Sequence, residues 1–204
     1  MLDFSIENEL HEKGYAVVCG IDEAGRGPLC GPVFAAACIL PPDWCPEGLN
    51  DSKKLTPKKR DKLFDEIREH AVAYAIASAS VEEIDALNIL EADLLAMRRA
   101  IDALPVHPDY ALIDGNIARD FQIPACAVIG GDAKSPSIAA ASILAKVARD
   151  RDCLELDRLY PQYGIAKHKG YGTKQHMDAL RTYGPSPIHR KQFIRFLDKG
   201  GETS

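Results

Sequence analysis

Five short apolar runs limit how this chain can fold. They lie at residues 15–21, 33–40, 72–78, 110–113 and 124–129 of the 204-residue sequence. Each is rich in β-branched or small apolar residues and is bounded by glycine, proline or polar residues, which is typical of strands. Helical patterns separate the third run from the second and from the fourth, and another follows the fifth. This order predicts an α/β fold, a mixed five-stranded sheet with helices on its faces.

The starts of these helices are visible in the sequence. Thr56 can cap a helix in which Pro57 takes the first position. Ser80 and Glu83 have the spacing of a capping box, and the apolar stripe that follows predicts a helical stretch to about residue 104, broken near Asn88. An alanine-rich segment at 138–159 predicts a helix that can lie close to the sheet.

The bulk composition favours one compact domain. We expect residues 1–204 to form a single domain with 160–204 as a small C-terminal extension. No apolar segment approaches the roughly 18 residues of a membrane span, and the first residues lack the apolar core of a signal peptide. The six cysteines form no C-x-x-C pair, so we expect reduced thiols and a cytoplasmic protein.

Charge is distributed unevenly along the chain. Residues 1–129 contain 12 Lys+Arg and 22 Asp+Glu, whereas residues 130–204 contain 13 and 8, giving −10 and +5. A basic C-terminal third on an acidic chain can attract a phosphate backbone towards an acidic, metal-loaded centre. Uneven solvated charge explains the same numbers equally well.

Carboxylates stand where the predicted strands end. Asp22, Glu23 and Asp114 end two strands, and Asp132 occupies a glycine-flanked turn before a helix. Because neighbouring strand ends converge, we expect the four to share one site, which a divalent cation would have to neutralise. Without His or Cys at zinc spacing beside them, hard Mg²⁺ or Mn²⁺ is favoured, and two such ions can hydrolyse a phosphodiester. For any one aspartate, a turn or cap is the simpler interpretation.

A glycine-fenced arginine follows the first acidic pair. Gly25, Arg26 and Gly27 do not make a dinucleotide loop, because Pro28 and Pro32 lead into another strand rather than a helix. Glycines let backbone amides approach a sugar or phosphate, and Arg26 can hold a phosphate oxygen. The alternative is a tight turn with a solvated arginine.

Basic and hydroxylic residues gather elsewhere in the chain. Lys53 lies in a polar loop, and Lys146 and Arg149 share a helical face with Ser142. Tyr171, between two glycines in KHKGYGTKQH, can stack on a sugar or base. Taken singly, each group is more simply a solvated face, whereas together with a metal site they favour nucleic-acid binding. Three C-terminal histidines lack a nucleophile motif, so Ser/His or Cys/His catalysis gains little support.

The chain resembles the bacterial ribonuclease HII family over nearly its whole length. The resemblance rests on GIDEAGRGPLCGPV, NDSKKLTPKKR, LIDGN, GGDAKSPSIAAASILAKVARDR, YPQYGIAKHKGYGTKQH and GPSPIHRKQF. It implies a ribonuclease H-like fold, a five-stranded mixed sheet flanked by helices, with a small helical C-terminal region. It also implies a two-metal endonuclease, using Mn²⁺ or Mg²⁺, that cuts RNA in RNA/DNA hybrids and incises 5′ of single ribonucleotides in duplex DNA. The ends left are a 3′-hydroxyl and a 5′-phosphate, and the roles implied are ribonucleotide excision repair and RNA primer removal.

Site residues follow from the same resemblance. Four carboxylates match the family's metal ligands, namely Asp22, Glu23, Asp114 and Asp132. The ribose-sensing step matches Gly25, Arg26 and Gly27, and the junction tyrosine matches Tyr171. Looser candidates for contact with the nucleic-acid backbone are Lys53, Ser137, Lys146 and Arg149.

Two features depart from the family's pattern. Cys30 stands where alanine is common, and the tail after Phe193 ends GGETS without an apolar-aromatic motif for a sliding clamp. The tail therefore predicts no clamp recruitment, and we also expect a monomer. The rival hypotheses are a DNA-only nuclease or recombinase-like transferase on the same scaffold, and a non-catalytic binder of RNA/DNA hybrids.

Overall fold

The computed structural model of the chain describes residues 2–42 and 44–197. One five-stranded sheet lies at its centre, in the order β3-β2-β1-β4-β5. The strands are β1 (Val18–Ala24), β2 (Val33–Ile39), β3 (Ala73–Ala79), β4 (Tyr110–Asp114) and β5 (Ala125–Val128). The first three pair antiparallel, and β4 joins β1 in parallel. The mixed sheet predicted from the apolar runs is therefore confirmed.

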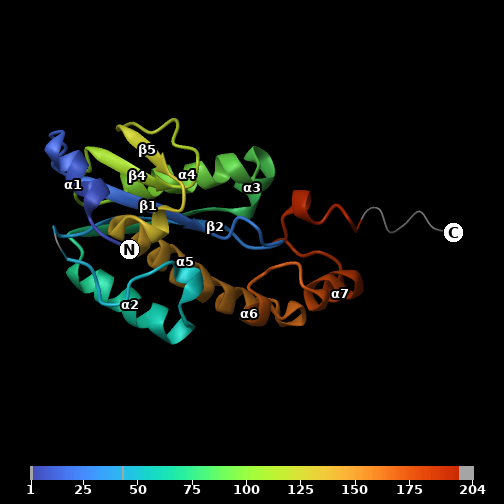
Figure 1. The fold of residues 1–204 in the computed structure, drawn as a ribbon. Coiled ribbons are helices and arrows are strands. Elements are labelled where there is room, and N and C mark those ends of the chain that lie inside the picture. Colours follow the sequence, from blue (N-terminus) through green and yellow to red (C-terminus); the bar gives the residue numbers. More distant parts are fainter. Residues whose placement is uncertain (1, 43, 198–204) are drawn as a thin grey trace.

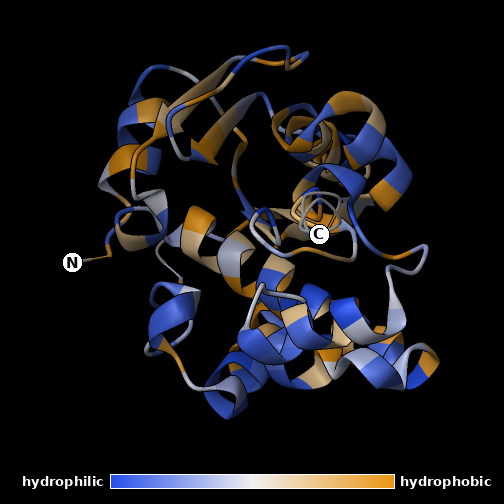
Figure 2. Cartoon of the chain, turned by 90° about the vertical axis from the view of Figure 1, so that its right-hand side faces the viewer, coloured by the Kyte–Doolittle hydropathy of each residue, from blue (hydrophilic) through white to orange (hydrophobic). Residues whose placement is uncertain are grey.

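Helices cover both faces of this sheet (Figure 1). One face carries α3 (Val81–Leu87) and α4 (Ile89–Asp102), and the other carries α5 (Pro136–Leu159) and α2 (Pro57–His70). The helix α1 (Ser5–Glu12) precedes β1, while α6 (Ile165–His168) and α7 (Lys174–Tyr183) follow α5. In Figure 2 hydrophilic residues dominate the helices below the sheet. None of the helices in the described ranges is long and apolar enough to cross a membrane.

Successive side chains of β1 point to opposite faces of the sheet, as in any strand. Cys19 and Ile21 belong to the apolar cluster that includes α4, whereas Ala24 belongs to the cluster under α5. At Gly20 the helix α5 approaches so closely that a Cβ atom would lie 2.1 Å from the backbone of Ser137. The absence of a side chain at Gly20 therefore allows α5 to lie against the central strand.

The predicted helix boundaries agree with the structure. The Thr56 side chain accepts a hydrogen bond from the amide of Lys59, and Ser80 and Glu83 form a reciprocal capping box. Asn88, with φ +77°, separates α3 from α4 and caps α4 with its side chain. The largest difference is β1, which begins at Val18 rather than Tyr15 and continues through Asp22 and Glu23 to Ala24. Pairing with β2 holds this acidic pair in the strand rather than in the turn after it.

A smaller apolar cluster forms beyond the sheet, where the C-terminal segments return to the turn between β1 and β2. Cys30 and Cys153 pack there with Tyr163, Ile165 and Leu180. The backbone of the turn is hydrogen-bonded directly to these segments. The Leu29 N–H donates to the carbonyl of Gly170, and the Leu29 carbonyl accepts from the N–H of Arg190. The C-terminal region is thereby attached to the glycine-rich turn. The prediction of no clamp recruitment concerned a tail that extends past residue 197, outside the described residues.

Candidate active site

Three of the four predicted carboxylates meet at one edge of the sheet. Asp22 lies near the end of β1, Asp114 ends the parallel strand β4, and Asp132 lies in the short 3-10 turn before α5. A carboxylate oxygen from each lies within 4.8 Å of those of the other two. Parallel pairing of β1 with β4 produces this arrangement, because it brings the carboxyl ends of both strands to one place.

Backbone contacts fix two of these carboxylates. The amide of Glu23 donates to Asp22 Oδ1 at 2.7 Å, and the amide of Gly131 donates to Asp114 Oδ1 at 2.7 Å. A Cβ atom at Gly131 would lie 2.5 Å from Ile138 and 3.2 Å from Asp114 Oδ1. The glycine before Asp132 therefore lets its turn approach the end of β4.

Burial and the closeness of several carboxylates disfavour the ionised forms of Asp22 and Asp132. Burial, then repulsion from Glu23 and Asp114, raises the pKa of Asp22 well above its ordinary value. Burial, then repulsion from Asp114 and Asp51, likewise raises the pKa of Asp132. A cation with hard-oxygen preference would remove this repulsion, and carboxylates are its usual protein ligands. The donor set therefore fits a divalent ion such as Mg²⁺ or Mn²⁺.

Glu23 borders the site from the other face of the sheet and does not belong to the group of three. Since neighbouring side chains on a strand point to opposite faces, Glu23 faces α4 while Asp22 faces α5. Its Oε1 lies 3.6 Å from Arg26 Nη1. Burial raises the pKa of Glu23, Arg26 lowers it, and Asp114 raises it further.

Arg26 is also held by Asp93, a residue of α4 that sequence reasoning did not single out. Arg26 Nε lies 3.5 Å from Asp93 Oδ2, and the Asp93 side chain is buried whereas that of Arg26 is about half exposed. Burial, then repulsion from Glu23, raises the pKa of Asp93 to about 8 despite Arg26. An aspartate within the apolar stripe of α4 was the available signal.

Lys53 lies beside the acidic group, in the 3-10 turn η1 (Ser52–Lys54). Ser142 of α5 donates a 2.8 Å hydrogen bond to Ser52 and so holds this turn against the sheet edge. Burial opposes the charge of Lys53, but attraction by Asp22 and Asp132 outweighs it and raises its pKa. Lys53 is therefore a fixed cation next to the carboxylates.

The glycine-rich turn is organised by Arg190, which sequence reasoning also missed. Its guanidinium is fully buried and donates to five backbone carbonyls, at 2.7 to 3.2 Å. These belong to Gly25, Arg26, Pro28, Gly31 and Pro32. The only signal was its place in the block GPSPIHRKQF.

Arg149 lies under the same turn rather than at the surface. It is buried, its Nη2 donates to the carbonyl of Lys169 at 2.8 Å, and its guanidinium lies 6.0 Å from the ring centre of Tyr171. Gly25 has φ +105°, and a Cβ atom there would lie 2.3 Å from Arg149 Nε. Gly25 is thus required both by its backbone conformation and by Arg149.

Tyr171 reaches the turn from the C-terminal region. A Cβ atom at Gly27 would lie 3.4 Å from its ring, and the tyrosine is 47% exposed. Its carbonyl is 3.1 Å from His176 Nδ1. The structure therefore places an exposed aromatic ring beside the Gly25–Gly27 step, although about 145 residues separate them in the sequence.

The remaining looser candidates are placed differently. Ser137 is buried at the start of α5, where its amide donates to the Glu7 carboxylate. Since Ser137 and Arg149 are each only 2% exposed, direct contact with a nucleic-acid backbone is not supported for either. Lys146 stays partly exposed and pairs with Asp150 at 2.6 Å.

The fold and the site together define a class of protein. The mixed sheet has three aspartates at one edge with a lysine beside them, and a glycine turn lies next to an exposed aromatic ring. This arrangement suits a metal-dependent enzyme that acts on a phosphate backbone. The comparisons with known proteins agree. A family model described as Ribonuclease HII matches residues 19–196. The chain belongs to this family.

Curated relatives support the assignment. Ribonuclease HII of Desulfitobacterium hafniense (strain DSM 10664 / DCB-2) is 58% identical over 187 residues, covering 92% of this chain and 72% of the relative. That of Idiomarina loihiensis is 58% identical over 177 residues, covering 87% and 95%. The chain is therefore a ribonuclease H-type endoribonuclease, and its family acts on RNA paired with DNA and depends on divalent metal ions.

Solved structures share the fold. Ribonuclease H2 from Pyrococcus horikoshii OT3 has a TM-score of 0.73 and 26% identity, covering 92% of this chain and all of that one. RNase HII in its complex with PCNA from Archaeoglobus fulgidus has a TM-score of 0.70 and 25% identity, covering 87% and 95%. The expected ribonuclease H-like fold is confirmed.

Proposed function

We propose that this endoribonuclease incises duplex DNA on the 5′ side of single embedded ribonucleotides, as well as cutting the RNA strand of longer hybrids. The observation that carries the proposal is the adjacency of two features: the carboxylate group at the sheet edge and the Gly25–Gly27 turn with Tyr171 beside it. The first suits hydrolysis of a phosphodiester, and the second suits recognition of one sugar.

Asp22, Asp114 and Asp132 would hold the catalytic ions, with Glu23 completing the set from the opposite face. Two divalent ions in such a site supply an activated water and a stabilised leaving oxygen. We propose Mg²⁺ or Mn²⁺, because all four side chains offer hard oxygen. The products of this route are a 3′-hydroxyl and a 5′-phosphate.

The glycine-rich turn would recognise the sugar. Gly25 and Gly27 present backbone rather than side chains, so an amide or carbonyl can reach the 2′-hydroxyl that distinguishes RNA from DNA. The Tyr171 ring offers a stacking surface at the next sugar, and half-exposed Arg26 can hold a phosphate oxygen.

Lys53 and Lys146 are the remaining candidates for phosphate contact. Lys53 adjoins the carboxylates, and Lys146 lines a groove between α2 and α5 with Arg60, Arg151 and Lys169. We propose residues 160–204 as the substrate-binding extension of a single domain, since Tyr171 and Arg190 connect it to the turn.

We propose action in the cytoplasm, as a monomer, in ribonucleotide excision repair and RNA primer removal. The relative from Archaeoglobus fulgidus is described in a complex with PCNA, and we propose no such complex for this chain.

The test of this function uses a DNA duplex with one ribonucleotide and its all-deoxy counterpart. With Mg²⁺ or Mn²⁺ we expect cleavage of the first and none of the second, because only the first has the 2′-hydroxyl. Equal cleavage of both would show a DNA nuclease instead.

A second experiment separates catalysis from binding. Asp114→Asn keeps the shape of the side chain but removes its charge, so we expect cleavage to fall by at least about 100-fold while the duplex still binds. A non-catalytic binder would show no turnover in the unmodified protein either.

A further inference from the structure

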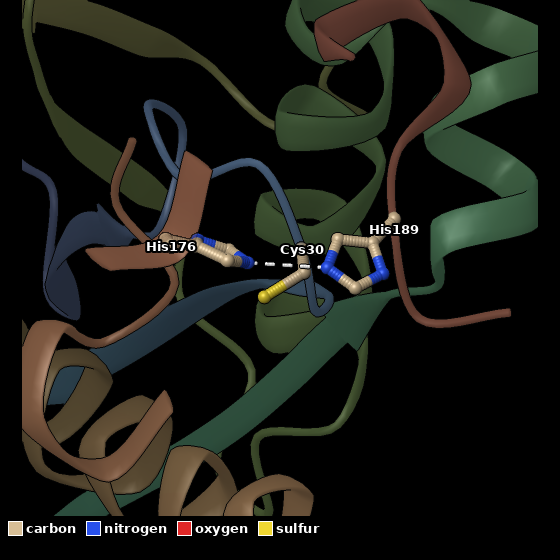
Figure 3. A group of neighbouring side chains, drawn as sticks. All are labelled: Cys30, His176 and His189. Carbon is tan, nitrogen blue, oxygen red and sulfur yellow. Dashed lines mark hydrogen bonds between the residues drawn. The ribbon is translucent and has the colours of Figure 1, made fainter. Parts of the chain in front are cut away.

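A second group of possible metal ligands lies behind the glycine-rich turn, apart from the carboxylates. Cys30 of the turn, His176 of α7 and His189 of the C-terminal segment each offer a ligand atom, and these atoms lie within 4.8 Å of one another. Figure 3 shows the sulfur of Cys30 beside the line that joins the two rings. All three residues are almost completely buried.

The spacing of the three ligand atoms is compatible with a zinc site. The Nε2 atoms of His176 and His189 are 3.1 Å apart. Zinc–nitrogen bonds of about 2.0 Å and zinc–sulfur bonds of about 2.3 Å put neighbouring ligand atoms roughly 3.3 to 3.6 Å apart. The two nitrogens are therefore nearly at ligand spacing, and the sulfur, which lies within 4.8 Å of both, would have to come within about 3.5 Å of them.

The outer nitrogen of His176 has the partner expected of a metal ligand, whereas that of His189 would have to take up a proton and donate to the Ser186 hydroxyl, 3.0 Å away, or to the Ser186 carbonyl. His176 Nδ1 lies 3.1 Å from the carbonyl oxygen of Tyr171, and His189 Nδ1 lies 3.3 Å from that of Ser186. Metal-binding histidines usually donate their second N–H to a carbonyl or carboxylate, which leaves Nε2 to bind the ion. Without a metal, the same rings form a neutral hydrogen-bonded pair, in which His189 Nδ1 accepts from the amide of Ser186 at 3.1 Å.

We propose that Cys30, His176 and His189 form a binding site for a soft divalent ion, zinc foremost, distinct from the catalytic carboxylates. Thiolate and imidazole are zinc ligands, whereas Mg²⁺ prefers oxygen. Binding replaces the S–H bond of Cys30 by a zinc–thiolate bond and releases one proton. Water supplies the fourth ligand.

The charges around the site bear on this exchange. Burial raises the pKa of the Cys30 thiol to about 12, against the influence of Arg149 and Arg190, so the metal-free thiol keeps its proton. Burial, then repulsion from His176, lowers the pKa of His189 to about 4, and burial lowers that of His176. Both imidazoles are neutral at pH 7 and have a lone pair to donate.

The ion would join three segments that form the recognition side of the enzyme. Cys30 follows the Gly25–Gly27 step, and His176 is bonded to the carbonyl of Tyr171. His189 precedes Arg190, which holds the carbonyls of the turn. Zinc would therefore stabilise the turn and Tyr171 relative to each other without taking part in the chemistry.

The experiment measures zinc bound to the full-length protein after gel filtration. The Asp114→Asn, Asp132→Asn double variant serves as the parent, because it weakens binding at the carboxylates. We expect one zinc per chain in the parent and its loss with Cys30→Ala or with Cys30→Ser, which nearly preserves shape. Cys45→Ser is the matched control, because Cys45 is exposed and lies outside the cluster, and it should retain the ion.

Cobalt provides an independent readout. Co²⁺ in the parent should give a thiolate-to-metal charge-transfer band that is absent from both Cys30 variants, and zinc should raise the melting temperature of the parent but not of these variants. No retained zinc in the parent, equal zinc in the Cys30 variants, or loss of zinc in Cys45→Ser would each overturn the proposal. Circular dichroism establishes that every variant compared is folded.

Discussion

Arg190→Met tests whether the C-terminal segment holds the glycine-rich turn in place. The change keeps an unbranched chain but removes five hydrogen bonds to the turn carbonyls. A hydrogen bond to a charged group contributes about 1.5 to 3 kcal/mol. The three partly buried carbonyls, of Gly25, Arg26 and Pro32, can bond to water instead after local relaxation. Loss of only two bonds still costs about 3 to 6 kcal/mol of unfolding free energy.

Urea denaturation measures this loss, and thermal unfolding should show it as a fall of roughly 6 to 24 °C, at the 2 to 4 °C per kcal/mol usual for this chain length. The control is Arg181→Met. Arg181 is exposed and forms a 3.0 Å surface pair with Asp178, so its loss should cost at most about 1 kcal/mol. If Arg190→Met costs no more than Arg181→Met, Arg190 does not hold the turn.

Three further predictions follow from single positions. Gly20→Ala should lower the unfolding free energy measured in urea by more than about 3 kcal/mol, since its Cβ would collide with the backbone of Ser137. The control Gly130→Ala, at φ +63° with no neighbour within 4 Å, should cost only about 1 to 2 kcal/mol. Equal losses would refute the close approach of α5. The raised pKa of about 8 means that between about pH 4 and pH 8 folded Asp93 keeps a proton that the unfolded chain releases, so the unfolding free energy falls as the pH rises. Asp93→Asn should make this fall smaller in urea titrations at several pH values. An unchanged pH profile would contradict this. Tyr171→Ala should weaken cleavage at single ribonucleotides, and unchanged steady-state kinetics would remove the ring from the site.

Local patterns in the sequence were sufficient to predict much of the fold. The strands follow from short apolar runs, and Thr56, Ser80 and Asn88 mark helix ends because capping depends on residues a few positions apart. Asp22 and Asp114 were predicted to share a site because both lie at strand ends, and the parallel pairing of β1 with β4 brings these two ends to the same edge.

Contacts between distant segments could not be predicted in this way. Arg190 binds backbone carbonyls, which every residue has, so no complementary side chain marks its partner. Arg149 and Ser137 lie in a basic or hydroxylic pattern that indicates a surface, yet both are buried by the packing of α5. Asp93 and the Cys30 cluster likewise become visible only when separate elements pack together.

The most direct test of the catalytic account is the identity of the ends left at a single ribonucleotide in duplex DNA. If water attacks the phosphate at the carboxylate site, the cut lies 5′ of the ribonucleotide and leaves a 3′-hydroxyl and a 5′-phosphate, and Asp132→Asn abolishes it. If the 2′-hydroxyl itself attacks, the cut lies on the 3′ side and leaves a 2′,3′-cyclic phosphate. Mass spectrometry of the products distinguishes the two, and a cyclic phosphate would contradict the role assigned here to the three aspartates.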